Sequence, residues 1–194
     1  MRLKAARSCL VVTSFLDEGH PDTPCPDWLL ANIALLTTAA QRLDVPLFMA
    51  HGNAAPIESL AFRLSPPPSD ARSVPGFATR ECNIGGLPDM MRRLGRKQAL
   101  FVGSLPIVQP LIARLSSAED GCTAYAVIDA IADDSAALEP PTLDRMRKAD
   151  CPLVTTEMAV FEWLERGDTP IFRELLPLIK RRALRRDFSA ESRK

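Results

Sequence analysis

Apolar positions along the chain follow two alternating patterns. Short apolar runs, typical of buried strands, are expected at residues 8–15, 45–50, 98–102, 122–129 and 152–155. Between and after these runs, apolar residues recur at every third or fourth position, which predicts helices at residues 27–43, 87–94, 106–117, 141–149, 156–165 and 169–186. Because strands and helices alternate, we expect an α/β fold, a three-layer α/β/α sandwich with a mainly parallel sheet.

One long segment breaks this alternation. Residues 51–79 contain Pro56, the triplet Pro66, Pro67 and Pro68, and Pro75. Proline has no amide hydrogen to donate to a sheet, so we expect irregular surface chain here. A functional lid, a subunit contact and a simple connection are all consistent with a loop of this length.

The last two helices carry distinct end signals. Thr156 is expected to cap the helix that follows it. The terminal helix and tail, residues 169–194, become basic from Lys180 onward. Cations near a carboxyl terminus complement the helix dipole, and a neighbouring subunit's acidic surface is an alternative partner for them.

Composition narrows the class of protein. The 194 residues suit one domain spanning 1–194, and 24 basic against 24 acidic residues give no broad basic field, so we expect no nucleic-acid partner. The five cysteines have no paired C-x-x-C spacing, which favours a reducing, cytoplasmic location. No apolar stretch approaches the roughly 20 residues needed to span a bilayer, so we expect no membrane partner.

The segment from Gln98 to Pro110 is arranged like an active-site turn. Its apolar strand ends at Gly103, and an amphipathic helix follows directly, with apolar residues at Ile107, Val108 and Leu111. In α/β proteins, ligands bind at the carboxyl ends of strands, and the amino terminus of a helix favours anions and thiolates. The segment is therefore the candidate site.

Four stretches together carry a family resemblance: Cys9 to Val12, and residues 32–48, 80–103 and 142–156. In their order and spacing, the chain resembles the isochorismatase-like cysteine hydrolases over nearly its whole length, especially their oligomeric branch of uncharacterised hydrolases. The resemblance implies a homo-oligomer. It also implies three catalytic residues: an aspartate that ends the first strand, a basic residue before the central strand, and a cysteine six residues after the strand-ending glycine.

Only one of these three implied residue types is present. The aspartate position falls on Thr13, or on Ser14 if the register shifts by one residue; the basic position falls on Arg80, and the cysteine position on Gln109. A carboxamide cannot attack as a thiolate does, and a hydroxyl cannot accept a proton near neutral pH as a carboxylate does.

The sequence therefore favours an inactive member of the family, a pseudoenzyme with a residual small-molecule cleft. The residues expected to line this cleft are Thr13, Ser14, Arg80, Asn83, Leu105, Pro106 and Gln109. We expect a small anionic or amide ligand, no cofactor and no metal. The resemblance also implies a cis bond in the turn, which we expect at Leu105–Pro106.

Two alternatives remain open at this point. The chain could be an active amide or ester hydrolase whose nucleophile has moved to Cys82, two residues from Arg80. It could also be a structural subunit in a mixed complex with an active relative. Cys9, Cys122 and Cys151 are expected to be core residues.

Overall fold

The structure is a computed structural model that describes residues 2–13, 26–52, 72–77, 86–117, 121–132 and 139–191. Its centre is a six-stranded sheet with the order β3-β2-β1-β4-β5-β6, in which every neighbouring pair is parallel. The strands are β1 (Ser8–Thr13), β2 (Leu47–Gly52), β3 (Arg72–Phe77), β4 (Gln98–Ser104), β5 (Thr123–Ala132) and β6 (Leu153–Val154).

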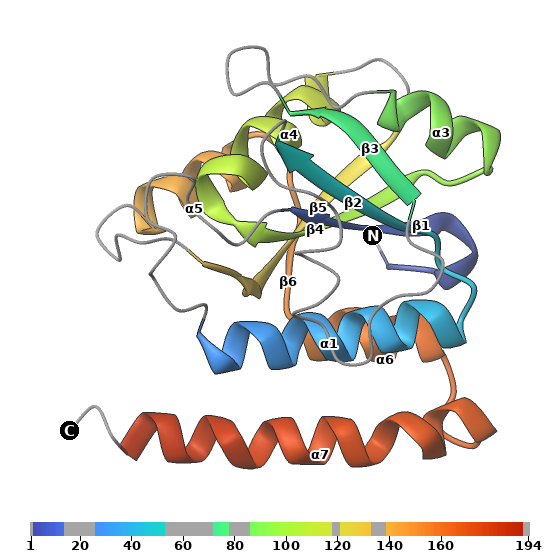
Figure 1. Ribbon diagram of the computed structural model, residues 1–194, viewed down its shortest axis with the longest axis vertical. Coiled ribbons are helices and arrows are strands. Elements are labelled where there is room, and N and C mark those ends of the chain that lie inside the picture. Colours follow the sequence, from blue (N-terminus) through green and yellow to red (C-terminus); the bar gives the residue numbers. More distant parts are fainter. Residues whose placement is uncertain are drawn as a thin grey trace.

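Helices cover both faces of this sheet (Figure 1). On one face lie α3 (Leu87–Arg93), α4 (Leu105–Ser117) and α5 (Glu139–Lys148), and on the other lie α1 (Asp27–Arg42) and α6 (Thr156–Leu164). The long helix α7 (Pro170–Glu191) lies outside α1 and α6, and a 3-10 turn, η1 (Ala5–Arg7), precedes β1. The predicted α/β/α sandwich with a parallel sheet is confirmed.

The strand sequences explain why both faces are covered. In β1 the side chains of Leu10 and Val12 point into the core beneath α1, while Cys9 and Val11 point into the core beneath α4. β4 and β5 divide their side chains in the same way. A strand whose two faces are both buried gives a continuous apolar run, because successive side chains point to opposite sides.

One prediction about the proline-rich segment was wrong. Within residues 51–79, expected to be irregular, β2 continues to Gly52, and Arg72–Phe77 forms β3. β3 is an edge strand, and its register against β2 shifts between Ala50 and Gly52, opposite Pro75 and Gly76. Proline is tolerated at an edge and at such an irregularity because no second neighbour needs its missing amide hydrogen.

The start of α6 also differs from expectation. Thr155, not Thr156, caps the helix, and its side-chain oxygen accepts a hydrogen bond from Met158 N at 3.2 Å. The predicted cap was wrong by one residue. Thr156 is fully buried and is bonded to β5 instead.

The strand order positions the candidate site. The chain runs outward from β1 to β2 and β3, and then returns to β4 on the other side of β1. Parallel sheets of this kind open a crevice at the carboxyl ends of the two strands where the order reverses, here β1 and β4. Thr13 ends β1 and Ser104 ends β4, so both strand ends lie at this point.

Candidate functional site

The backbones of β1 and β4 approach each other very closely where the two strands end. Gly103 has φ 122°, a left-handed conformation that favours glycine. A Cβ atom added to Gly103 would lie 2.8 Å from the carbonyl oxygen of Thr13 and closer still to its hydroxyl. The turn from β4 into α4 therefore requires glycine both for its conformation and for the space that Thr13 occupies.

The side chain of Thr13 joins the two strand ends. It is fully buried; its hydroxyl donates to the carbonyl oxygen of Val102 at 3.1 Å and accepts from the amide of Ser104 at 3.2 Å. A hydroxyl has a single hydrogen, and in this geometry Thr13 uses it in the bond to the backbone carbonyl of Val102. At the position where the resemblance implies an aspartate, the residue present fastens β1 to the turn.

The turn leads directly into α4, which contains the other predicted residues of this segment. Leu105, its first residue, is buried in the core with Val108 and Leu111, whereas Pro106 is exposed and Gln109 is half-buried. Pro110 lies one residue further along and has no amide hydrogen for the carbonyl of Pro106. Gln109 lies six residues after the strand-ending Gly103, in the second turn of α4.

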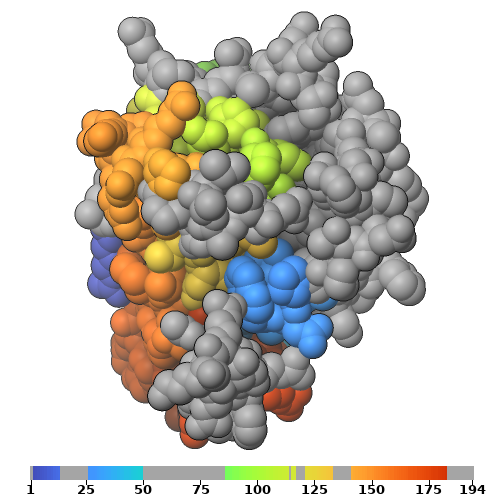
Figure 2. Space-filling model, turned by 90° about the vertical axis from the view of Figure 1, so that its left-hand side faces the viewer, coloured from blue at the N-terminus to red at the C-terminus, as the bar shows by residue number. Residues whose placement is uncertain are grey.

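Figure 2 views the face on the left-hand side of Figure 1. The beginning of α4 (yellow-green), part of β5 (yellow) and the start of α1 (blue) reach the surface together on this face. Ser14, Arg80, Cys82 and Asn83 lie outside the described residues. Of the residues predicted to line the cleft, the structure describes Thr13, which ends β1, and Leu105, Pro106 and Gln109, which lie in α4 directly after β4. Their grouping around a ligand and the isomer of Leu105–Pro106 stay predictions.

Two of the described cysteines, Cys9 and Cys151, are poor candidates for a nucleophile. Cys9 and Cys151 are buried and Cys122 is half-buried. Burial raises the pKa of Cys9 well above its usual range and the pKa of Cys151 to about 11, so both stay protonated thiols at neutral pH. The core positions predicted for Cys9 and Cys151 are confirmed.

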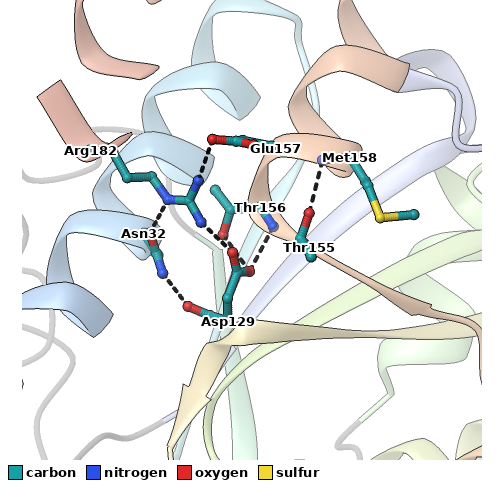
Figure 3. A network of polar contacts seen from close by, with 7 residues as sticks. All are labelled: Asn32, Asp129, Thr155, Thr156, Glu157, Met158 and Arg182. Atoms are coloured by element: carbon teal, nitrogen blue, oxygen red, sulfur yellow. Dashed lines mark hydrogen bonds and ion pairs between the residues drawn. The ribbon is translucent and has the colours of Figure 1, made fainter. Parts of the chain in front are cut away.

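A buried ionic network, absent from our predictions, lies near the same sheet edge (Figure 3). Asp129 Oδ1 accepts hydrogen bonds from the amide and hydroxyl of Thr156 at 2.7 and 2.9 Å, and Asp129 Oδ2 forms an ion pair with Arg182 of α7. Arg182 also donates from Nη1 to Glu157 at 2.8 Å and from Nε to Asn32 Oδ1. Asn32 in turn donates to the backbone carbonyl of Asp129.

The sequence contains a signal for this network. Arg182 follows Leu175 and Ile179 by seven and three residues, so it continues the apolar stripe of the terminal helix, and its side chain is only 4% exposed. An arginine on the buried side of a helix needs a carboxylate partner. The run of basic residues from Lys180 to Arg186 hid this position in the sequence.

Two further findings concern the described part of the chain. None of its helices is both long and apolar enough to cross a membrane. Within the same residues, no three His, Cys, Asp or Glu side chains are grouped so that they could hold a metal ion.

Comparison with solved structures places this fold. A MAR1 ribonuclease from Caenorhabditis elegans is 18% identical, with 92% of each chain covered and a TM-score of 0.70. The YcaC gene product of Escherichia coli, described as an octameric hydrolase of unknown specificity, is 18% identical, with 97% of each chain covered and a TM-score of 0.68. An isochorismatase family protein from Burkholderia thailandensis is 17% identical, with a TM-score of 0.62 over 83% of this chain and 97% of the other.

The chain therefore has the fold of the isochorismatase-like cysteine hydrolases, as the sequence resemblance implied. No protein-family model matches the sequence, and no curated protein matches it.

Proposed function

We propose that this protein is an isochorismatase-like hydrolase homologue that has lost catalysis and binds a small molecule where β1 and β4 end. The observation that carries the proposal is the chemistry of the two aligned positions. Gln109 stands where the resemblance implies the nucleophile, and Thr13 stands where it implies the carboxylate base. Similarity of fold over 97% of both chains supports one domain of this type in residues 1–194.

Neither residue can perform the implied step. Acyl transfer to cysteine needs a thiolate and a nearby base to manage its proton, whereas a carboxamide has no nucleophilic sulfur and no labile proton. The Thr13 hydroxyl donates to the carbonyl of Val102, so it is committed to holding the strand ends together. The two substitutions affect different steps of the same reaction, which strengthens the case for lost activity.

Ligand binding is compatible with the same residues. The Gln109 side chain offers both a donor and an acceptor, which matches an amide, and the amino terminus of α4 favours an anion. Arg80 and Asn83 are the residues we expect to add a cation and a second amide. The proposed ligand is therefore a small anion or amide.

Binding can be tested with benzamide and benzoate as probes in a calorimetric titration. We expect at least one of them to bind the wild type and to lose affinity in Gln109→Leu. Gln41→Leu is the matched control, because Gln41 is also half-buried. It lies in the last turn of α1, just before β2 begins, and therefore at the amino-terminal ends of the strands, away from the candidate site. Equal affinity in the wild type and Gln109→Leu would contradict the proposed site.

Catalysis is tested separately, with a panel of small amides and esters and an RNA oligonucleotide as substrates. We expect no turnover above the buffer rate with any of them. Saturable turnover that disappears in Cys82→Ser, together with rapid and selective alkylation of Cys82 by iodoacetamide, would instead support a relocated nucleophile.

We further propose a cytoplasmic homo-oligomer. Equal numbers of acidic and basic residues impose little repulsion between copies, and Met158 and Phe161 of α6 are 46% and 43% exposed, three residues apart on one helix. The octameric description of the E. coli YcaC product supports the same idea. Light scattering should detect an assembly that Phe161→Glu dissociates; a monomeric wild type would contradict it, and copurification with a related active chain would favour a mixed complex.

A further inference from the structure

β5 departs from a regular strand beside the candidate site. Phe101 of β4 pairs with Ala126 of β5, but Gly103 pairs with Ile131. One residue of β4, Val102, therefore faces the four residues 127–130 of β5, so β5 contains three extra residues here. Such a segment cannot follow the ladder, and its buried backbone groups need other partners.

The ionic network of Figure 3 supplies one of those partners. Asp129 lies in the extra segment, and Asn32 of α1 donates to its backbone carbonyl. Its carboxylate is held by Thr156 at the start of α6 and by Arg182 of α7. We name the group of Asn32, Asp129, Glu157 and Arg182 the Arg182 clasp. Through it, three helices hold one irregular segment of β5.

The other end of the segment contacts the candidate site. Ile131, two residues after Asp129, pairs with Gly103 in the β4–α4 turn. Its side chain is buried in the same core cluster as Leu105 and Val108 of α4. A change in the path of residues 127–130 would therefore move the partner of Gly103 and the packing beneath the start of α4.

We propose that Arg182 is a positioning residue: the Arg182 clasp sets the path of β5 residues 127–130, and through Ile131 it fixes the β4–α4 turn and Gln109. The C-terminal helix thus controls the geometry of the candidate site without touching it. Only the identification of that turn as a ligand site rests on the proposed function; the coupling itself is a property of the fold.

The charge balance of the clasp makes Arg182 its central member. Two carboxylates, Asp129 and Glu157, converge on one guanidinium that is 4% exposed. If the guanidinium is removed, these two acidic side chains face each other with no cation between them, and Asn32 Oδ1 loses the hydrogen bond that Arg182 Nε donates to it. The extra segment of β5 then loses the contact that connects it to α7.

The test follows the turn directly and needs no ligand. A thiol is introduced with Gln109→Cys, and its alkylation by iodoacetamide is followed by peptide mass spectrometry, with hydrogen exchange measured over residues 99–112. Adding Arg182→Met should raise the alkylation rate by roughly two- to thirtyfold, the range of measured coupling between distant residues. Exchange at residues 103–108 should rise as well.

The matched control is Arg42→Met. Arg42 of α1 pairs with Glu174 of α7 at 2.5 Å, so this pair joins two of the same helices, but its side chains are 56% and 46% exposed. We expect Arg42→Met to leave both readouts unchanged. Amide hydrogen exchange at the amino-terminal ends of β1 and β4 is a second reference. That end of the sheet is held by separate contacts, among them the hydrogen bond that Lys4 N donates to Gln98 at 2.9 Å, so it should not respond to Arg182.

Arg182→Lys keeps the charge with fewer donors and should give an intermediate rate, which guards against a Met variant that fails to fold. The inference is overturned if a folded Arg182→Met or Arg182→Lys variant leaves residues 103–108 unchanged, or if exchange rises equally over the whole sheet, as simple destabilisation would produce. Discovery of hydrolytic activity in the wild type would refute the proposed function and leave this result unaffected.

Discussion

Two regions at the carboxyl ends of the strands are held together in opposite ways, one by a neutral hydroxyl and one by charges. The β1–β4 corner, formed by Thr13, Gly103 and Ser104, is held by a neutral hydroxyl bonded to backbone groups. The Arg182 clasp is held by charges, a buried guanidinium from α7 and partly buried carboxylates from β5 and α6. The neutral corner lies where the resemblance implies a catalytic carboxylate, whereas the charges of the clasp are paired with one another.

This difference distinguishes charged groups that stabilise the fold from charged groups that catalyse a reaction. A charged group that serves catalysis must stay available to a substrate, whereas a charged group that serves the fold must be fully compensated. Asp129 is compensated by a guanidinium and two hydrogen bonds from Thr156. At the corner, Thr13 provides cohesion without charge, which is consistent with a site that binds and does not react.

The largest effect is expected from breaking the clasp. Arg182→Met should lower the free energy of unfolding by about 3–4 kcal/mol, because the buried guanidinium is lost and Asp129 and Glu157, which are 20% and 37% exposed, lose the cation they share. Arg42→Met, which removes the exposed pair between α1 and α7, should cost only about 0–1 kcal/mol. Urea denaturation measures both, and equal costs would remove the distinction between the two ion pairs.

The next largest loss of stability is expected when a side chain is added at Gly103, in the β1–β4 corner. Gly103→Ala should cost about 3 kcal/mol or more, since backbone strain of about 1–3 kcal/mol adds to the contact with Thr13. Gly95→Ala is the control: Gly95 also has a positive φ, 66°, but nothing lies within 4 Å of the added Cβ. We expect about 1–2 kcal/mol there. A cost at Gly103 no greater than at Gly95 would show that the close approach to Thr13 is unimportant.

A smaller effect is expected when the Thr13 hydroxyl is removed. Thr13→Val keeps the shape but deprives the Ser104 amide of its acceptor, which should cost about 1–3 kcal/mol. Amide exchange at Ser104 should accelerate in Thr13→Val and stay slow in Thr13→Ser, which keeps the oxygen. Fast exchange in both variants would mean that packing of the methyl group, and not the hydroxyl, holds the corner.

The smallest effect concerns the buried thiol of Cys151, whose pKa is raised to about 11 by burial. The folded state holds this proton more tightly than the unfolded chain, so the stabilisation is complete well below pH 9.0, the ordinary pKa of the thiol, and is lost as the pH rises from there toward 11. Between pH 8 and pH 10 we expect a loss of about 1 kcal/mol that Cys151→Ser lacks. Identical pH profiles for both proteins would contradict a buried, inert thiol.

The sequence predicted the parts of the fold that depend on local pattern. Apolar runs with two buried faces identified β1 and β4, and the stripe from Ile33 to Ala40 identified α1, because burial imposes those periods on the sequence. β3 was not predicted, because Pro75 argues against a strand in the middle of a sheet. Only the order of the strands in the folded sheet shows that β3 lies at an edge.

The candidate site was predictable only in part. The position of Gly103 followed from where the central apolar strand ends, and that of Thr13 followed from the family resemblance, but the bonds from the Thr13 hydroxyl to Val102 and Ser104 depend on side-chain direction. The Arg182 clasp joins residues 150 and 53 positions apart in the chain, Arg182 with Asn32 and Arg182 with Asp129. No local pattern identifies the partners of Arg182. Its own position on the apolar stripe was a signal, but the surrounding basic run made it look like one of several solvated charges.

The central claim, that the corner binds without reacting, is tested most directly by one NMR experiment in which benzamide is mixed with the wild-type protein and followed over several days. We predict saturable shifts of the Gln109 side-chain amide while the benzamide signals keep their full intensity. Steady conversion of benzamide to benzoate and ammonia, at a rate proportional to protein concentration, would contradict the account.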